Sequence, residues 1–287
     1  MSHIRKAESI DINSVLLSDK KKNKKTDGKS AYVNYKSPRD KLILQLPKMI
    51  LPYGSSIANK KKVDEGTEKP KYVINLSFGG YQDNPKVKAL MDILNQIDEK
   101  LVSIAKAKKW MGNISEEVLR SKLKRSVKYS YDDDGNLKDY PPTLKVKVQS
   151  NYKDPEKFDT VFYDKNREIT DINPSNILDT INSGSSCRTI IECRGVYFIG
   201  TEFFGITWAA KQVQVFPNSN EIKEWAFTPD SDDEEEDEDE EETEKGKGKQ
   251  PATDDNPEEV SFGSGGSEYD SDGPEPEEGE QDQEHEL

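Results

Sequence analysis

The charge of this chain is divided between two regions of opposite sign, and this division limits what each region can fold into. From Asp230 to Leu287 the sequence has 27 Asp and Glu residues against 3 Lys, a net charge of −24. The whole chain of 287 residues carries −14, so residues 1–229 carry +10. Like charges repel, and the acidic segment has few apolar side chains to bury in compensation. We therefore predict a disordered acidic tail at 230–287 and a folded basic region before it.

The basic region is predicted to have a leader, a domain and an insertion. Residues 1–30 form a lysine-rich leader around the run Lys20–Lys25. We expect this leader to be flexible and to act as a nucleic-acid-binding arm, as a nuclear-import signal or only as a solvated loop. Residues 31–229 form the domain, with short strand-like segments between turns and a helical insertion at about 85–125. This pattern predicts a mainly β (α+β) fold, a small barrel or sandwich with one helical side.

The insertion is predicted from apolar side chains that recur at intervals of three and four between Val87 and Ile104. This spacing places them on one face of a helix, and Pro85 suits the first turn of that helix. The apolar face either packs on the sheet or pairs with a second copy in a homodimer.

Apolar and polar side chains alternate in the segment Thr143–Val148, which is typical of a strand with one buried face. The polar face of this strand carries Lys145 and Lys147. A turn-rich stretch containing Asp134-Gly135 precedes the strand, and it predicts a hairpin with the segment Val127–Tyr131.

No catalytic constellation can be built from the sequence. The chain has two histidines, His3 and His285, and we expect both to lie in disordered termini, which excludes histidine-based catalysis and His-rich metal sites. The carboxylates 132–134 could converge in a metal nuclease, but solvated turn residues are the favoured interpretation. Cys187 and Cys193 are expected to be buried, reduced thiols. We therefore predict a non-enzymatic protein with no catalytic residue, no metal and no cofactor.

The sequence has no segment that suits a membrane. No apolar run approaches the roughly 20 residues that are needed to span a bilayer. No secretory signal is recognisable either. We therefore expect an intracellular protein that does not contact a membrane.

Single strands of nucleic acid are bound by a positively charged groove that follows the backbone and by aromatic rings that stack on bases. The basic region interleaves both kinds of side chain on its strand-like segments. Tyr129 and Tyr131 share one face of a strand, so either both are exposed or both are core. Lysines are predicted to contact phosphates and aromatic residues to stack on bases. The predicted nucleic-acid-binding residues are Lys128, Tyr129, Tyr131, Lys145, Lys147, Phe203, Trp208 and Lys211.

The segment from Phe203 to Val215 reads FFGITWAAKQVQV. It resembles the closing strands of single-stranded DNA-binding proteins from nucleocytoplasmic large DNA viruses, which are related to the replication protein of short-tailed phages. The resemblance implies an OB-fold-like antiparallel barrel with a helical insertion and an acidic tail that binds the replicative polymerase or primase-helicase. This chain departs from the phage pattern because it ends in Leu287 instead of an aromatic residue. The final strand implied by the resemblance contains Trp208, Lys211, Gln212 and Gln214.

We therefore predict sequence-independent binding of single-stranded DNA, or of RNA, in viral DNA replication and recombination. The tail would compete with nucleic acid for the basic region and recruit replication proteins. The resemblance implies action in the host cytoplasm or virus factory, in the nucleus, or in the virion. Two alternatives stay open: a histone-chaperone-like protein whose acidic tail captures basic proteins, and a virion structural protein that assembles through the apolar stripe of 87–104.

Overall fold

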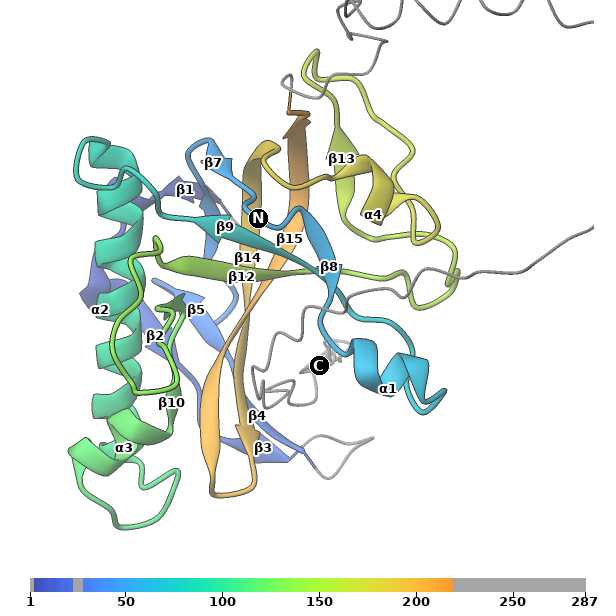
Figure 1. Cartoon of the computed structure of the whole chain (residues 1–287). Helices are drawn as coiled ribbons and strands as arrows, with labels where there is room; N and C mark the ends of the chain where they lie inside the picture. The colour runs from blue at the N-terminus through green and yellow to red at the C-terminus, as the bar shows by residue number, and fades with distance from the viewer. Residues whose placement is uncertain (1–2, 23–27, 219–287) are drawn as a thin grey trace, which may run out of the picture. The chain divides into compact units, whose positions relative to one another are not determined.

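The computed structural model describes residues 3–22 and 28–218 (Figure 1). The predicted acidic tail, residues 219–229 and part of the lysine run lie outside the described residues. The helices are α1 (Lys60–Asp64), α2 (Pro85–Ala107), α3 (Glu116–Lys122) and α4 (Ile177–Thr180), with short 3-10 helices at Ala7–Ser9 and Ile12–Ser14. The strands are β1 (Ile4–Lys6), β2 (Val15–Leu17), β3 (Lys21–Lys22), β4 (Lys29–Ala31), β5 (Val33–Tyr35), β6 (Ile43–Gln45), β7 (Met49–Ile50), β8 (Ser55–Ile57), β9 (Tyr72–Ser77), β10 (Leu123–Lys124), β11 (Val127–Lys128), β12 (Thr143–Val148), β13 (Val161–Tyr163), β14 (Ser186–Ile199) and β15 (Phe203–Phe216).

The strand pairings close into a ring. β14 pairs with β7, β7 with β9, β9 with β12, β12 with β15, and β15 again with β14. All of these pairs are antiparallel except β12 with β15. Each strand of the ring is therefore paired on both sides over at least part of its length. The prediction of a mainly β chain with few helices is confirmed.

The core lies on one face of the ring, as the alternation in β12 predicts. Leu144 and Val146 are fully buried, and Val148 is 4% exposed, whereas Lys145 and Lys147 between them are only half-buried. The hairpin is also confirmed, because Val127 of β11 lies opposite Leu144 in an antiparallel pair. One face of β12 is therefore core and the other carries positive charge.

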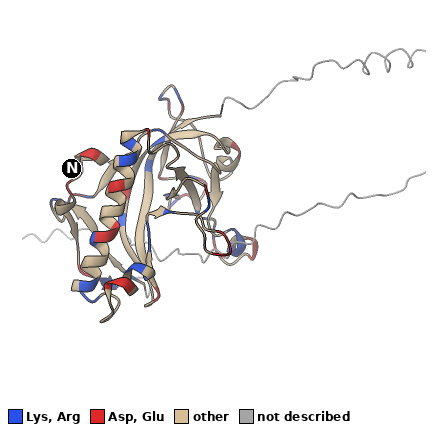
Figure 2. Cartoon of the chain, turned by 60° about the vertical axis from the view of Figure 1, so that its left-hand side comes forward, with Lys and Arg blue, Asp and Glu red and all other residues tan. Residues whose placement is uncertain are grey.

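α2 begins where the sequence predicts. The side chain of Asn84 caps it by accepting hydrogen bonds from the backbone N–H groups of Lys86 and Val87, and Pro85 occupies the first turn. The predicted apolar stripe packs against the 3-10 helices, α3 and β11. Figure 2 shows both basic and acidic residues along α2. Because the stripe is buried within one chain, it does not offer the dimer or virion-assembly surface that the sequence left open.

The structure differs from the flexible leader expected at residues 1–30. β1 pairs in parallel with β6, and β2 pairs antiparallel with β5. Ala7 and Val15 are buried at 6% and 1% exposure, and the guanidinium of Arg5 forms an ion pair with Asp40. The strands here are only three residues long, too short for a periodic pattern to reveal them.

Both cysteines are free thiols inside β14, with exposures of 0% for Cys187 and 3% for Cys193. Burial raises the pKa of Cys187 to about 11 and also raises the pKa of Cys193. Such thiols stay protonated and unreactive at neutral pH, so the prediction of buried, reduced cysteines is confirmed. Among the described residues, no helix is both long enough and apolar enough to span a membrane.

Candidate nucleic-acid interface

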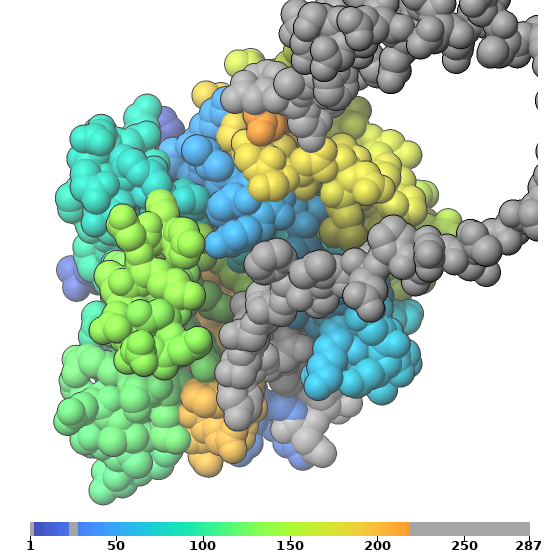
Figure 3. Space-filling model, in the orientation of Figure 1, coloured from blue at the N-terminus to red at the C-terminus, as the bar shows by residue number. Residues whose placement is uncertain are grey.

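A shallow hollow of about 50 Å³ gathers basic side chains on the face of β12 that is turned away from the core. Tyr197, Ile206, Thr207 and Trp208 also line it. Figure 1 shows β12 crossing β15 in this part of the sheet. In Figure 3 the green segment around residues 120–140 forms the surface on the left of the view. We name this site the basic hollow; its basic residues are Lys124, Arg125, Lys128, Lys145 and Lys147.

The strand register explains why these residues meet. β14 occupies one edge of β15 along its whole length, so β10, β12 and β13 follow one another along the other edge. Lys124 lies opposite Gly205, and Lys147 lies opposite Ala209 four residues further along β15. β11 adds Lys128 by pairing with the outer end of β12. Segments that are separated in sequence therefore place their lysines around one stretch of β15.

Gly205 permits the close approach of two parts of the basic hollow. A Cβ atom at this position would lie 2.8 Å from Tyr197 Oη and 2.9 Å from the carbonyl oxygen of Lys124. Real Cβ contacts are not this short, so a side chain would displace either β10 or the Tyr197 ring. The packing requires glycine at position 205 because the backbone of β10 lies too close for a side chain.

Two adjacent carboxylates of α2 hold the segment 124–128 in place. Asp98 is fully buried and accepts hydrogen bonds from the backbone N–H of Ser126 at 2.8 Å and from its hydroxyl at 3.0 Å. The indole N–H of Trp208 donates to the same hydroxyl at 3.0 Å. Glu99 accepts a hydrogen bond from the Arg125 guanidinium at 2.8 Å. Burial raises the pKa of Asp98 to about 6, against the lowering effect of its two bonds to Ser126.

The aromatic residues predicted to stack on bases differ in exposure. Tyr129 and Tyr131, which directly follow β11, are 41% and 59% exposed, so the pair is exposed and not core. Phe203 is half-buried, and the ammonium of Lys124 lies 4.0 Å from its ring centroid. Trp208 is only 2% exposed and its indole N–H is already bonded. We therefore correct the stacking role predicted for Trp208, because no base can reach its face.

Lys211 does not line the basic hollow. Its ammonium lies 3.0 Å from a carboxylate oxygen of Glu192, whose side chain is 2% exposed. Lys41 lies 3.1 Å and Arg194 3.7 Å from the other oxygen of Glu192. Burial alone would raise the pKa of Glu192, but the bond from Lys211 and the charges of Lys211 and Lys41 hold it below its ordinary value. We name these four residues the Glu192 cluster, and its lysines neutralise a buried acid.

Of the predicted lysines, Lys128, Lys145 and Lys147 come together, and Lys211 does not. Sequence reasoning missed Lys124 and Tyr197 as members of the site. β10 has only two residues, so no periodicity identifies Lys124 as part of a strand. Tyr197 lies among buried apolar residues at the end of β14, so its pattern reads as core, and its pairing opposite Gly205 places it in the lining of the hollow.

The carboxylates at 132–134 form a turn, as the favoured interpretation held. One oxygen of Asp132 accepts hydrogen bonds from the backbone N–H groups of Asp134 and Asn136, at 3.1 and 2.7 Å. In the part of the chain that the structure describes, no group of three or more His, Cys, Asp or Glu residues could hold a metal ion.

Solved structures that resemble this chain include single-stranded DNA-binding proteins of bacteriophages. One is gp2.5, a single-stranded DNA binding protein encoded by bacteriophage T7, with 15% sequence identity, a TM-score of 0.39, and coverage of 66% of this chain and 99% of that chain. Another is the single-stranded DNA-binding protein from bacteriophage Enc34 in complex with ssDNA, with 18% identity, a TM-score of 0.36, and coverage of 72% and 98%. A C-terminal truncation of the Enc34 protein has 16% identity, a TM-score of 0.37, and coverage of 74% and 98%.

These three structures come from phages, and none of them is from a nucleocytoplasmic large DNA virus. No family of known proteins matches the sequence, and no curated protein matches it. Because the TM-scores lie below 0.5, the function has to be argued from the residues of this chain.

Proposed function

We propose that this chain is a non-enzymatic protein that binds single-stranded nucleic acid in the basic hollow, without sequence preference. The observation that carries the proposal is the convergence of five basic side chains from β10, the residue after it, β11 and β12 on one surface. Neutralising phosphates with such side chains releases counterions, which drives binding whatever the sequence.

The state of the individual cations supports this role. Lys145 forms no ion pair with any residue in 3–22 or 28–218, although it is half-buried. Arg125 does pair with Glu99, which orients its guanidinium at the rim but leaves fewer donors for a phosphate. Partial burial of a lysine ammonium costs free energy when no carboxylate lies beside it. A bound phosphate would offset that cost.

Single strands are favoured over duplex because exposed tyrosines lie next to the cations in sequence. Tyr129 directly follows Lys128 and Tyr131 lies two residues beyond it, and the two side chains are 41% and 59% exposed. Rings of this kind gain stacking energy only from bases that are already unstacked, which a duplex does not offer. The same chemistry serves DNA and RNA, and we propose DNA as the ligand.

The remaining parts of the proposal concern fold and context. The closed ring of strands supports an OB-fold-type barrel as the scaffold. The net charge of −24 from Asp230 onward and of +10 before it supports competition between the acidic segment and nucleic acid.

We propose that this protein is intracellular and acts in viral DNA replication or recombination. We also propose that its acidic segment recruits replication proteins.

The test replaces Lys145 and Lys147 together by alanine in the full chain. Fluorescence anisotropy with labelled single strands should show binding weakened more than about tenfold at ~0.1 M salt, because two phosphate contacts are lost. The slope of log affinity against log salt should also fall by about 1.4. Unlabelled duplex serves as a competitor that should displace the strand poorly.

The matched control is the double variant Lys88→Ala/Lys157→Ala, which removes the same charge from lysines that pair with Asp92 and Asp154. It should bind almost as the unmodified chain does. Equal affinities and equal salt slopes in all three proteins would rule out the basic hollow as the binding site.

Competition by the acidic segment is tested in the full chain by replacing the carboxylates at 232–242 with amides. The amide form should bind single strands more tightly at low salt, and the difference should shrink as salt rises, since the competition is electrostatic. A gain in affinity of the amide form that stays the same at all salt concentrations would contradict this mechanism.

A further inference from the structure

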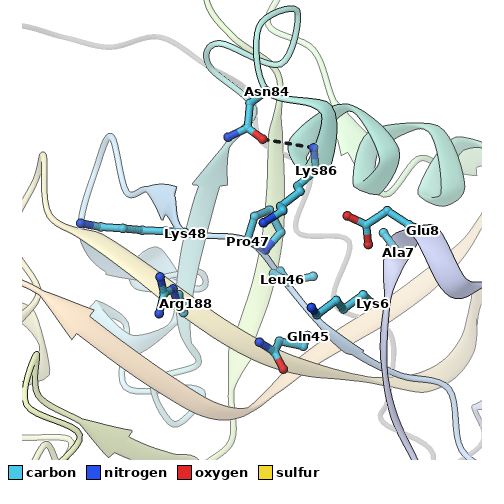
Figure 4. A pocket seen from close by; sticks show the side chains of 10 residues that line it. All are labelled: Lys6, Ala7, Glu8, Gln45, Leu46, Pro47, Lys48, Asn84, Lys86 and Arg188. Carbon is cyan, nitrogen blue, oxygen red and sulfur yellow. Dashed lines mark hydrogen bonds between the residues drawn. The ribbon is translucent and has the colours of Figure 1, made fainter.

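A second polar groove lies away from the basic hollow. Two cavities of about 350 and 300 Å³ share Gln45 and Arg188, and neither shares a lining residue with the basic hollow. Figure 4 shows the larger cavity, with Lys6, Lys48 and Lys86 among the side chains around it. We name the two cavities together the glutamine groove; its basic residues are Lys6, Lys48, Lys86, Arg167 and Arg188, and its glutamines are Gln45, Gln212 and Gln214.

Strand register builds the floor of the glutamine groove from two rows of side chains. Gln214 lies between Tyr163 of β13 and Arg188 of β14 in one row. Ile190 lies between Gln212 and Gln45 in the next row. Side chains two residues apart on a strand share a face, so both rows open to the same side. β15 thus contributes to the basic hollow through 206–208 and to the glutamine groove through 212–214.

The cations of the glutamine groove have no carboxylate partner among the described residues. All five are exposed, and within residues 3–22 and 28–218 none of them forms an ion pair with a carboxylate. Glu8 also lines the larger cavity, so the groove keeps a clear excess of positive charge. By contrast, surface lysines such as Lys88 and Lys157 are each matched to an acid.

Two of these cations are held in position by the same aromatic ring. The ammonium of Lys48 lies 4.3 Å and the guanidinium carbon of Arg188 lies 5.9 Å from the ring centroid of Phe216. The side-chain amide of Gln214 donates to the carbonyl oxygens of Asp164 and Lys165, which ties the turn that carries Arg167 to the sheet. A ligand therefore meets side chains whose positions are largely set before it binds.

The side chains that line the glutamine groove indicate which kind of polyanion it can bind. Guanidinium groups bind phosphate through paired donors. A glutamine amide carries both donors and an acceptor, which matches the edges of bases, and a tyrosine ring offers a stacking face. A polycarboxylate has only acceptors at its charged groups, so it would leave the amide oxygens of Gln45 and Gln212 unmatched.

We propose that the glutamine groove binds a further segment of single-stranded nucleic acid. This inference rests on the proposed function, and the segment is either the continuation of the strand in the basic hollow or a separate strand. In both cases the ligand is a phosphodiester backbone with unstacked bases.

The test uses the full chain and the double variant Lys48→Ala/Arg188→Ala, with Lys88→Ala/Lys157→Ala as the charge-matched control. Anisotropy titrations use labelled single strands of about 8 and about 30 nucleotides, since one OB-type site covers about 4–16. The long strand should bind the variant about tenfold more weakly at ~0.1 M salt. If one strand continues into the groove, the short strand keeps its affinity. If the groove takes a separate strand, the unmodified chain binds two short strands and the variant binds one.

Both substituted side chains are exposed, and a second variant, Lys6→Ala/Lys86→Ala, provides an independent test if the first one misfolds. If neither groove variant changes long-strand affinity or short-strand stoichiometry while Lys145→Ala/Lys147→Ala weakens binding, the groove inference fails and the proposed function stands. If Lys145→Ala/Lys147→Ala is also without effect, the proposed function fails. If the effect of Lys48→Ala/Arg188→Ala disappears once the carboxylates at 232–242 are amides, the groove binds the acidic segment instead.

Discussion

The basic hollow and the Glu192 cluster contain similar residues in similar strands, yet they have opposite roles. Lys145 of β12 and Lys211 of β15 are both partly buried lysines beside apolar neighbours. The ammonium of Lys211 lies 3.0 Å from a carboxylate that is 2% exposed, so its charge is used inside the protein. Lys145 lines a hollow with four other cations. The difference shows that the function of a lysine depends on whether the fold brings it a carboxylate.

The two regions also differ in where their acidic residues lie relative to the cations. In the Glu192 cluster the acid lies among the basic groups and pairs with them directly. In the basic hollow, Asp98 and Glu99 of α2 hold Ser126 and Arg125 from behind. Asp98 therefore positions the backbone of the site without neutralising its lysines. Four predictions test this comparison, ordered from the largest expected effect to the smallest.

Replacement of Glu192 by glutamine should lower the free energy of unfolding by about 3 kcal/mol, because it leaves the surrounding cations without their buried partner. Denaturant unfolding measures this loss. Glu156→Gln, at an exposed turn, is the control and should change stability by less than about 0.5 kcal/mol. If the Glu192 variant is as stable as the unmodified chain, its neighbours are not a structural cluster.

Asp98 should make stability depend on pH. Its folded pKa of about 6 lies above the ordinary value of 3.8, so the folded chain binds this proton more tightly than the unfolded chain. The contribution of Asp98 to the free energy of unfolding is thus full below about pH 4 and is lost as pH rises through about 6. The stability difference between the unmodified chain and Asp98→Asn should shift by about 2 to 3 kcal/mol between pH 4 and pH 7. If the stability difference between the two proteins is the same at pH 4 and pH 7, folding does not raise the pKa of Asp98.

Tyr131→Leu should weaken single-strand binding by about 1 to 2 kcal/mol, since it removes a stacking ring next to the basic hollow. Anisotropy titration measures the change. Tyr152→Leu is the control, because Tyr152 is 92% exposed and does not line the hollow. Equal losses in both variants would indicate a general effect of surface aromatics and not a site.

Lys211→Ala and Lys145→Ala should separate stability from binding. Loss of Lys211 should lower the free energy of unfolding by about 1 kcal/mol and leave affinity within a factor of about two. Loss of Lys145 should weaken binding about fivefold and leave stability nearly unchanged. The opposite pattern would reverse the roles assigned to the two regions.

Much of the fold follows from local patterns. The apolar spacing and the cap predict α2, and the alternation at 143–148 predicts both the buried and the basic face of β12. The Asp-Gly turn predicts the pairing of β11 with β12. These features are visible in sequence because each depends on residues within a few positions of one another.

The site was only partly predictable. Lys128, Lys145 and Lys147 were predicted to lie together because they are on or next to a patterned strand, and the structure places them in one hollow. Trp208 was misassigned because exposure depends on what covers a residue, and here Ser126 and Asp98 come from distant parts of the chain. The ordered N-terminal residues were missed for a similar reason, since β1 is held by a strand about forty residues away.

The sequence by itself determined the separation of charge, the mainly β class, the long helix and the basic face of β12. Only the tertiary structure decided that Lys211 neutralises Glu192, that Lys124 and Tyr197 belong to the basic hollow, and that the glutamines of β6 and β15 meet in a groove. The physical reason is that charge and periodicity are properties of neighbouring residues, whereas ion pairs, burial and cavities depend on which strands lie side by side.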